Sequence, residues 1–250
     1  MHRCYVDPAI WSDSEVLLSS ASEHHLVNVL RVAAGEMIEL FDGKGRQAVA
    51  RVTMERGRKA ILKVEKTSFI PRPLLSISLL QALPKGARMD LIIEKATELG
   101  VAAIHPVVTE RTVVRLNDSA KKEDRRERWQ RIAINAAEQS GVKWIPEIKP
   151  VTDFDHVLSA GHDCDIFLVG SLGSDARPLR KVLCEAREKK PLSAAILIGP
   201  EGDLSPLELK KAADAGAIPV GFGPNVFRVE TAAIFAISVL AYEFGSSSNC

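Results

Sequence analysis

The first part of the chain shows the partly alternating apolar and polar pattern of short strands. Residues Glu36–Phe41 (EMIELF) alternate in part, the pair Asp42-Gly43 follows, and Gln47–Val52 and Ala60–Val64 are two more strand candidates. An Asp-Gly pair next to alternating hydrophobic residues is a strong hairpin signal. The pattern therefore predicts a small β domain over residues 1–70.

Beyond this point, apolar runs alternate with amphipathic segments. The candidate strands are Leu74–Ala82, Ala103–Val108, Asp165–Gly170, Ala194–Ile198 and Ile218–Phe222. The candidate helices are Ala87–Leu99, Asp124–Ser140, Pro178–Glu188, Pro206–Ala215 and Thr231–Phe244. Regular strand–helix alternation is typical of a parallel sheet covered by helices on both faces. The chain is thus predicted to be an α/β protein whose second domain, residues 74–250, follows a stiff Pro71-Arg72-Pro73 linker.

Two glycine- and proline-containing loops follow predicted strands. One is Gly199–Asp203, which precedes a helix start where Ser205 and Glu208 fit a capping box. The other is the stretch GFGPNVFRVETAA, from Gly221 to Ala233. Open α/β sheets bind ligands at the carboxyl ends of their strands. Neither loop has a dinucleotide or phosphate-loop fingerprint. An ordinary connection and a site for a flat adenine-containing ligand are both compatible with the first loop.

Arg228 and Glu230 are the charged residues of the second loop. They fit two interpretations: a salt bridge that orders the loop, or an Arg228 guanidinium that stabilises negative charge developing on a substrate. Thr231 fits an N-cap of the last helix.

The overall charge does not indicate a partner, because 33 Lys and Arg residues balance 32 Asp and Glu residues. The local charge is more informative. Residues 43–66 hold eight basic and two acidic side chains. A basic stretch of this kind favours contact with RNA phosphates.

The four cysteines lie far apart and form no C-x-x-C pair, which argues against a metal site and a disulfide framework. The longest nearly apolar stretch, Ala232–Tyr242, is too short to span a bilayer. These features predict a cytoplasmic protein without metal or membrane partners.

The motifs GPEGDLSPLE (199–208) and FGPNVFRVETAA (222–233) together resemble the SPOUT methyltransferases. Within them they resemble the RsmE type, which methylates ring N3 of a uridine in 16S, the small-subunit ribosomal RNA. The segments KGARMDLIIEKATELGV and RWQRIAINAAEQSGVKWIPEI agree with the same family. The resemblance covers nearly the whole chain.

The resemblance implies a PUA-like RNA-binding β-barrel over residues 1–70 and a SPOUT domain with a C-terminal trefoil knot over residues 74–250. In this family S-adenosylmethionine sits among three loops of the knot. The cofactor-binding residues that this implies here are Leu172, Gly173, Ile198, Gly199, Pro200, Glu201, Gly202, Phe222, Gly223, Pro224 and Phe227. This sequence departs from the family pattern at Asp203, Asn225, Val229 and Val142.

The same resemblance implies catalytic roles for Arg228, Glu230 and Thr231. Arg228 is expected to stabilise a uridine anion, and Glu230 to handle the proton or to orient Arg228. The RNA-binding candidates are Arg3, His25, Arg31, Lys44, Arg46, Arg58, Lys85 and Arg88.

The expected partners are 16S rRNA or the small ribosomal subunit, and a second copy of the chain that completes the substrate pocket. Two alternatives stay open. One is a ribose 2′-O methyltransferase of the same fold, and the other is a non-catalytic RNA-binding factor for ribosome assembly.

Overall fold

The computed structural model describes residues 1–18, 23, 26, 31–54, 60–113, 118–159 and 163–245. Contacts between residues divide the chain into two compact units. The first unit combines Met1–Arg72 with Ile134–Ile145, and the second holds Pro73–Ala133 together with the chain from Pro146 onward. The segment Ile134–Ile145 lies in the sequence range that was assigned to the second domain.

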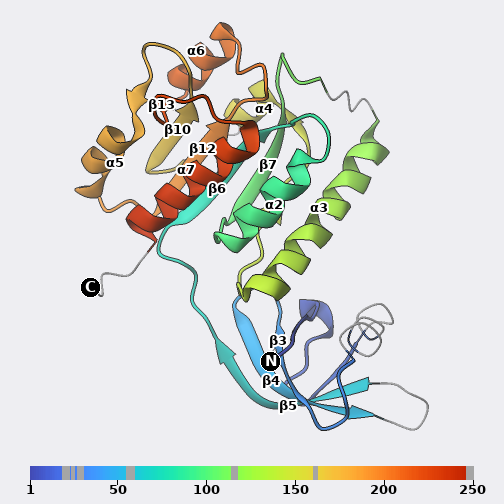
Figure 1. The fold of residues 1–250 in the computed structure, drawn as a ribbon. Helices are drawn as coiled ribbons and strands as arrows, with labels where there is room; N and C mark the ends of the chain where they lie inside the picture. Colours follow the sequence, from blue (N-terminus) through green and yellow to red (C-terminus); the bar gives the residue numbers. More distant parts are fainter. Residues whose placement is uncertain are drawn as a thin grey trace. The chain divides into compact units, whose positions relative to one another are not determined.

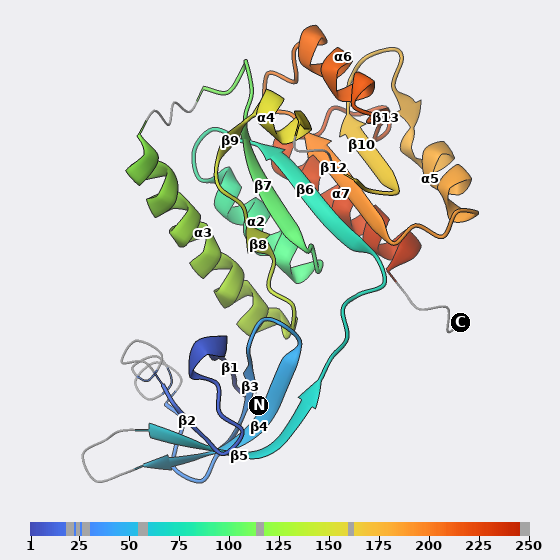
Figure 2. The same ribbon diagram turned by 180° about the vertical axis from the view of Figure 1, so that it is seen from behind.

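The first unit contains a mostly antiparallel sheet of five strands (Figure 2). In spatial order these are β1 (Arg3–Tyr5), β3 (Met37–Phe41), β4 (Arg46–Met54), β5 (Ala60–Phe69) and β2 (Glu15–Leu17), and a short 3-10 helix, η1 (Pro8–Ile10), follows β1. The predicted hairpin is present, because Phe41 pairs with Gln47 across a turn in which Gly43 has a φ of +71°. The strands β1 and β2 are only three residues long, too short to give a pattern.

The segment 143–145 runs beside the hairpin turn of the first unit. The amide of Gly45 donates to the Lys143 carbonyl at 3.0 Å, and the amide of Ile145 donates to the Gly43 carbonyl at 3.0 Å. Trp144 pairs with Lys44 in an isolated antiparallel bridge. Residues 143–145, which are distant in sequence, therefore pair with the hairpin turn through backbone hydrogen bonds.

The second unit is built on a parallel sheet (Figure 1). Its strands, in spatial order, are β11 (Arg177–Pro178), β13 (Ile218–Gly221), β10 (Ile166–Gly170), β12 (Ser193–Ile198), β6 (Ser76–Ala82), β7 (Ala103–Val108) and β8 (Glu147–Ile148), while β9 (Thr152–Asp153) also pairs with β7. The central strands β10, β12 and β6 are apolar on both faces, as expected for a sheet covered on both sides.

Helices cover both faces of this sheet (Figures 1 and 2). They are α2 (Arg88–Glu98), α3 (Ser119–Ser140), α4 (Phe154–Ser159), α5 (Leu179–Arg187), α6 (Pro206–Asp214) and α7 (Val229–Phe244). α2 and α7 pack against each other, and α7 also contacts β6 and β12. Phe154 and Val157 of α4 join Ala212 of α6 in a separate apolar cluster. The predicted mixed α/β class is confirmed.

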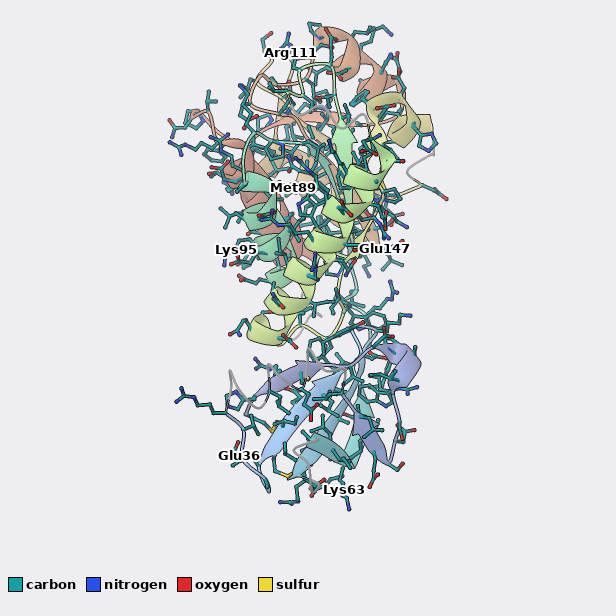
Figure 3. All side chains as sticks on the ribbon, turned by 90° about the vertical axis from the view of Figure 1, so that its right-hand side faces the viewer. Glu36, Lys63, Met89, Lys95, Arg111 and Glu147 are labelled. Carbon is teal, nitrogen blue, oxygen red and sulfur yellow. The ribbon has the colours of Figure 1, made fainter. Side chains whose placement is uncertain are left out.

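The helix ends follow local chemistry. Ser205 caps α6, accepting a hydrogen bond from the Glu208 amide at 3.3 Å, while the Glu208 carboxylate accepts one from the Ser205 amide at 2.8 Å. The predicted capping box is therefore confirmed. On α2, Met89 is buried and Lys95 faces solvent, where it forms ion pairs with neighbouring glutamates (Figure 3).

Two predicted helix starts are wrong. α3 begins at Ser119 rather than Asp124, because polar residues continue the helix where its apolar pattern is weak. α7 begins at Val229 with Arg228 as its N-cap residue, so Thr231 lies inside the first turn and does not cap the helix. Within the described residues, no helix is long and apolar enough to cross a membrane.

Candidate active site

A cavity of about 800 Å³ lies in the second unit where three loops meet. The loops are residues 170–173 after β10, residues 198–203 after β12, and residues 221–230 between β13 and α7. Because β13, β10 and β12 are parallel neighbours, their carboxyl ends lie at one edge of the sheet. That edge is where open α/β sheets bind ligands.

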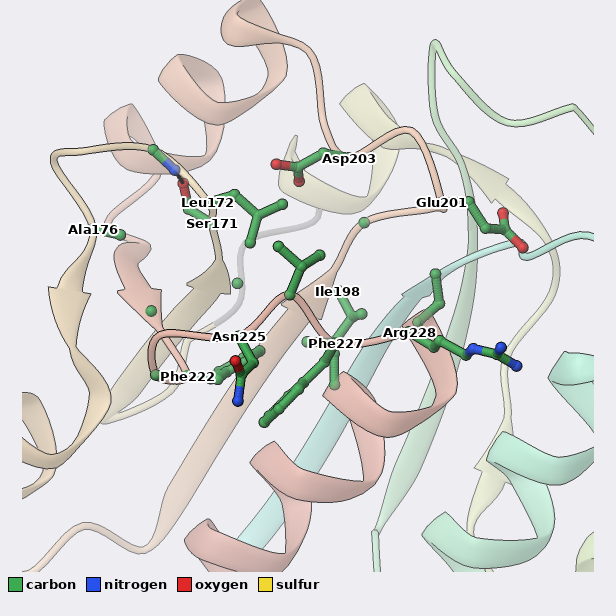
Figure 4. A pocket seen from close by; sticks show the side chains of 18 of the residues that line it. Ser171, Leu172, Ala176, Ile198, Glu201, Asp203, Phe222, Asn225, Phe227 and Arg228 are labelled. Atoms are coloured by element: carbon green, nitrogen blue, oxygen red, sulfur yellow. Dashed lines mark hydrogen bonds between the residues drawn. The ribbon is translucent and has the colours of Figure 1, made fainter.

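Apolar side chains form much of the cavity wall. Leu172, Ile198 and Phe227 surround the same open space (Figure 4). The rings of Phe222 and Phe227 are nearly parallel, with centroids 6.4 Å apart and an interplanar angle of 16°. Both rings also pack against Phe235 of α7. This wall suits a flat, largely apolar group.

The loop after β12 is held in one conformation by its own backbone. A Cβ atom at Gly199 would lie 3.1 Å from the amide nitrogen of Leu204, so a larger residue here requires the backbone at Leu204 to shift by a few tenths of an ångström. Asp203 has a φ of +60°, and its Oδ1 atom accepts a hydrogen bond from the Leu204 amide at 2.8 Å. Asp is among the residues that adopt left-handed backbone most readily after glycine. Asp203 is thus compatible with a position where the family pattern has glycine.

Arg88, at the start of α2, contacts carboxylates from two of the loops. Its guanidinium forms an ion pair with Glu201, and its Nε atom lies 3.6 Å from Oε2 of Glu230. The Lys85 amide also donates to Glu201 at 3.0 Å. Burial alone would raise the pKa of Glu201. Backbone hydrogen bonds from Glu201 itself and Lys85, with the Arg88 guanidinium, instead hold that pKa below its ordinary 4.5.

Arg228 is exposed at the mouth of the cavity, and its side chain extends away from Phe227 and Ile198 (Figure 4). Among the described residues, no salt bridge joins Arg228 to Glu230 or to another carboxylate. Glu230 instead faces Arg88, and its side chain is 14% exposed. In the described part of the chain its Oε2 atom has no hydrogen-bond partner. Arg228 and Glu230 therefore do not form the loop-ordering salt bridge, and no described carboxylate pairs with the Arg228 guanidinium.

Most of the predicted cofactor-binding residues line this cavity. The lining includes Leu172, Gly173, Ile198, Gly199, Pro200, Glu201, Phe222, Gly223, Pro224 and Phe227. Gly202 does not line it, and its carbonyl accepts a hydrogen bond from Arg111 at 2.7 Å. Of the catalytic candidates, Arg228 and Glu230 line the cavity, whereas Thr231 is exposed and does not.

Sequence reasoning missed several lining residues. These include Ala176 and Pro178, which reach the site because β11 pairs with β13. No local pattern marks a strand of two residues. Asn225 and Val226 also line the cavity, and both lie in the loop Phe222–Phe227 that the family resemblance assigns to the cofactor.

The predicted RNA-binding residues are placed differently from one another. Arg88 lies in the cavity wall, and Lys85 is exposed beside it. In the first unit, Arg3 pairs with Glu39 at 3.1 Å and donates to the Gln139 carbonyl at 3.0 Å. Its guanidinium therefore stabilises the end of a helix. The exposed candidates of the first unit are Arg31, Lys44 and Arg46, and His25 and Arg58 lie outside the described residues.

Among the residues that the structure describes, no group of three or more His, Cys, Asp or Glu side chains is arranged to hold a metal ion. Cys4, Cys164 and Cys184 are free thiols.

The sequence profile of a family described as "RNA methyltransferase domain" matches residues 71–241, and one described as "RNA methyltransferase PUA domain" matches residues 24–65. The first match covers well over half of the chain. The chain belongs to this RNA methyltransferase family. The small N-terminal strand domain is accordingly PUA-like.

The names of individual similar proteins agree with this family assignment. "Ribosomal RNA small subunit methyltransferase E" from Bacillus subtilis is 31% identical over 88% of this chain and 87% of its own length. The enzyme of the same name from Neisseria gonorrhoeae, solved with bound S-adenosylmethionine, has a TM-score of 0.86 and 33% identity, covering 98% of each chain. A putative methyltransferase from Legionella pneumophila, also solved with S-adenosylmethionine, has a TM-score of 0.88 and 30% identity, covering 98% of each chain. The fold is that of these RsmE-type SPOUT methyltransferases.

Proposed function

We propose that this protein is an enzyme that transfers a methyl group from S-adenosylmethionine to ring N3 of a uridine in 16S ribosomal RNA. The observation that carries the proposal is the cavity at the carboxyl ends of β10, β12 and β13, with Arg228 at its mouth and no carboxylate of the described residues paired with it. The names of the family members support the rRNA substrate.

The cavity fits a methyl donor of this kind. Its volume of about 800 Å³ lies within the range of small-molecule sites. Phe222, Phe227, Leu172 and Ile198 offer apolar contact to a base, and the backbone at Gly199 and Gly223 allows close approach of polar groups. When bound, S-adenosylmethionine supplies a methyl group activated by a positively charged sulfur.

The task of Arg228 follows from the chemistry of uracil. Loss of the N3 proton leaves a negative charge that is shared between N3 and the two flanking carbonyl oxygens. A planar guanidinium can donate two hydrogen bonds to such a delocalised anion, and it acts most strongly where water is excluded. Arg228, free of a carboxylate partner among the described residues, is positioned for this role.

Glu230 provides an acceptor for the N3 proton. Glu230 is one of the residues that line the cavity, and its buried Oε2 atom has no hydrogen-bond partner in the described part of the chain. The Arg88 Nε atom lies 3.6 Å from this oxygen, so the ion pair orients the carboxylate without forming a hydrogen bond to it. Proton acceptance is therefore better supported for Glu230 than the orienting of Arg228. Thr231 keeps no separate role in this scheme.

The two domains have different proposed roles. We assign RNA binding to the PUA-like domain, residues 1–70, and methyl transfer to the SPOUT domain, residues 74–250, with the C-terminal knot that the family resemblance implies. The target base has to leave its stack to reach the cavity, and RNA contacts must offset that cost. We place the enzyme in the cytoplasm, as a homodimer.

Mass spectrometry of nucleosides tests the activity. Ribosomal RNA that lacks the modification is incubated with the protein and isotopically labelled S-adenosylmethionine, then digested. The expected product is labelled 3-methyluridine. Labelled ribose-methylated nucleosides would instead identify a 2′-O methyltransferase, and RNA binding without any label transfer would indicate an assembly factor.

A further inference from the structure

The first unit carries a partly exposed row of aromatic and arginine side chains, none of which lines the cavity of the second unit. We call it the aromatic–arginine row, and its members are Trp11, Arg46, Phe69, Arg72 and Trp144. Of these five residues, only Arg46 is among the RNA-binding candidates that the sequence suggests.

One half of the row is built across the β4–β5 ladder (Figure 2). Arg46 and Phe69 are direct cross-strand partners, so their side chains lie on the same face of the sheet. The guanidinium carbon of Arg46 lies 5.5 Å from the ring centroid of Trp11. Trp11 itself packs against the core of the unit. The guanidinium of Arg46 therefore packs on a ring that is itself held by the core.

The other half is built on Trp144. Its indole nitrogen donates to the Ile70 carbonyl at 3.0 Å, and a Cβ atom at Gly45 would lie only 2.6 Å from its ring. This close packing fixes the indole. The guanidinium carbon of Arg72 lies 4.4 Å from the Trp144 ring centroid, and Phe69 meets the same ring edge-on at 5.9 Å.

Two features of the row are not explained by folding. Phe69 is 62% exposed although it is a large aromatic residue. Among the described residues, neither Arg46 nor Arg72 forms an ion pair with a carboxylate. Two arginines without a carboxylate partner among the described residues, beside an exposed ring, form a surface that is positively charged and offers flat faces.

We propose that the aromatic–arginine row is a stacking platform for unpaired bases of the substrate RNA. The proposal rests on the proposed function in that the substrate is RNA. Bases outside a duplex expose their faces and stack on aromatic rings and on guanidinium planes, whereas paired bases within a duplex do not. The positive charge of the two arginines attracts the phosphates that flank these bases. The row therefore binds single-stranded RNA next to the target in preference to a duplex.

Binding of RNA to the full-length protein tests the platform. The probes are a short labelled single-stranded RNA of mixed sequence and the same strand in a blunt duplex. Phe69→Ala is expected to weaken binding of the single strand by roughly 5- to 100-fold, the range of one lost base stack, with little effect on the duplex. Leu17→Ala is the matched control, because Leu17 is an apolar residue of the same sheet with 63% exposure.

A second variant separates stacking from charge. Arg72→Lys keeps the positive charge but loses the planar group. We expect weaker binding of the single strand with an unchanged dependence of affinity on salt. Wild-type affinity in both Phe69→Ala and Arg72→Lys, or equal losses for single strand and duplex, would overturn the platform.

The outcomes separate this inference from the proposed function. If the wild-type protein methylates rRNA while Phe69→Ala binds the single strand normally, the platform is wrong and the function stands. If the wild-type protein methylates no RNA while Phe69→Ala selectively loses single-strand binding, the function is wrong and the platform stands.

Discussion

Arg228 has a particular environment at the mouth of the cavity. Its backbone is extended as the N-cap residue of α7, with a φ of −65° and a ψ of 156°, and its side chain does not cap the helix by a hydrogen bond. The carboxylate that is nearest in sequence, Glu230, is engaged by Arg88. The helix start thus holds an exposed guanidinium at the mouth of the cavity, and none of the described carboxylates pairs with it.

This environment predicts the effect of removing Arg228. Arg228→Ala should lower the single-turnover methylation rate by about 10²- to 10³-fold, because it removes a donor to developing charge. Arg228→Lys should recover little, since an ammonium lacks the planar fork. Affinities for RNA and S-adenosylmethionine should change little in both variants. A wild-type rate in Arg228→Ala would show that the residue has no part in the chemistry.

Gly199 and Gly202 form a matched pair in the loop after β12. A Cβ at Gly199 would press on the backbone at 3.1 Å, whereas a Cβ at Gly202 would make ordinary contact with Arg111 at 3.5 Å. Gly199→Ala should therefore shift the loop and weaken S-adenosylmethionine binding by about 1–3 kcal/mol, while Gly202→Ala should have little effect. Calorimetry on the folded variants measures both affinities. Equal losses in the two variants would contradict this assignment of the cavity wall.

At the scale of elements, Arg88 connects α2 to the loop after β12 and to the first turn of α7. The pairs with Glu201 and Glu230 are partly exposed, with the Arg88 side chain 39% accessible. Such pairs each contribute less than about 1 kcal/mol to stability. Their effect is mainly geometric, because they keep the loop after β12 and the first turn of α7 at one separation.

The lowered pKa of Glu201 gives this contact a pH dependence. A carboxyl whose pKa is lower in the folded state contributes stability above its ordinary 4.5, and the contribution is lost as pH falls through the folded value. The unfolding free energies of wild type and Glu201→Gln should differ at neutral pH, by less than about 1 kcal/mol, and should converge below pH 4.5. Urea unfolding at a series of pH values measures this difference. A difference that is constant with pH would show that the ion pair is not formed in solution.

At the scale of the whole molecule, α7 is apolar around most of its circumference. Val229, Ala233, Ala236, Ile237 and Leu240 are buried inside the unit. Tyr242 of the same helix is 84% exposed, and Leu91 of the adjoining α2 is 40% exposed. Packing of α7 against a second copy of the chain would cover such exposed apolar side chains.

We therefore expect a homodimer in solution. Light scattering coupled to size exclusion should give twice the mass of the 27.3 kDa chain, and Tyr242→Lys should shift the population toward monomer. Leu207→Lys is the control, because Leu207 is 59% exposed on α6, a different helix. A fully active wild-type monomer would exclude the dimer.

Local chemistry was sufficient for much of the fold and for the loops of the site. The capping box at Ser205, the hairpin at Asp42-Gly43 and the apolar strands Ala103–Val108 and Ala194–Ile198 depend on near neighbours in the sequence, so their patterns were readable. The family motifs likewise marked the two glycine-containing loops. The knot remains a prediction from that resemblance.

What depends on distant parts of the chain was decided by the tertiary structure alone. No local pattern could show that Glu230 forms an ion pair with Arg88 rather than with Arg228, because Arg88 and Glu230 meet only when α2 packs against α7. Nor could it show that Trp144 supports Arg72, or that β11 brings Ala176 and Pro178 to the cavity. Sequence determines which side chains are available and how each segment folds locally. Packing determines which charges are paired, and so which guanidinium is left free to act on a substrate.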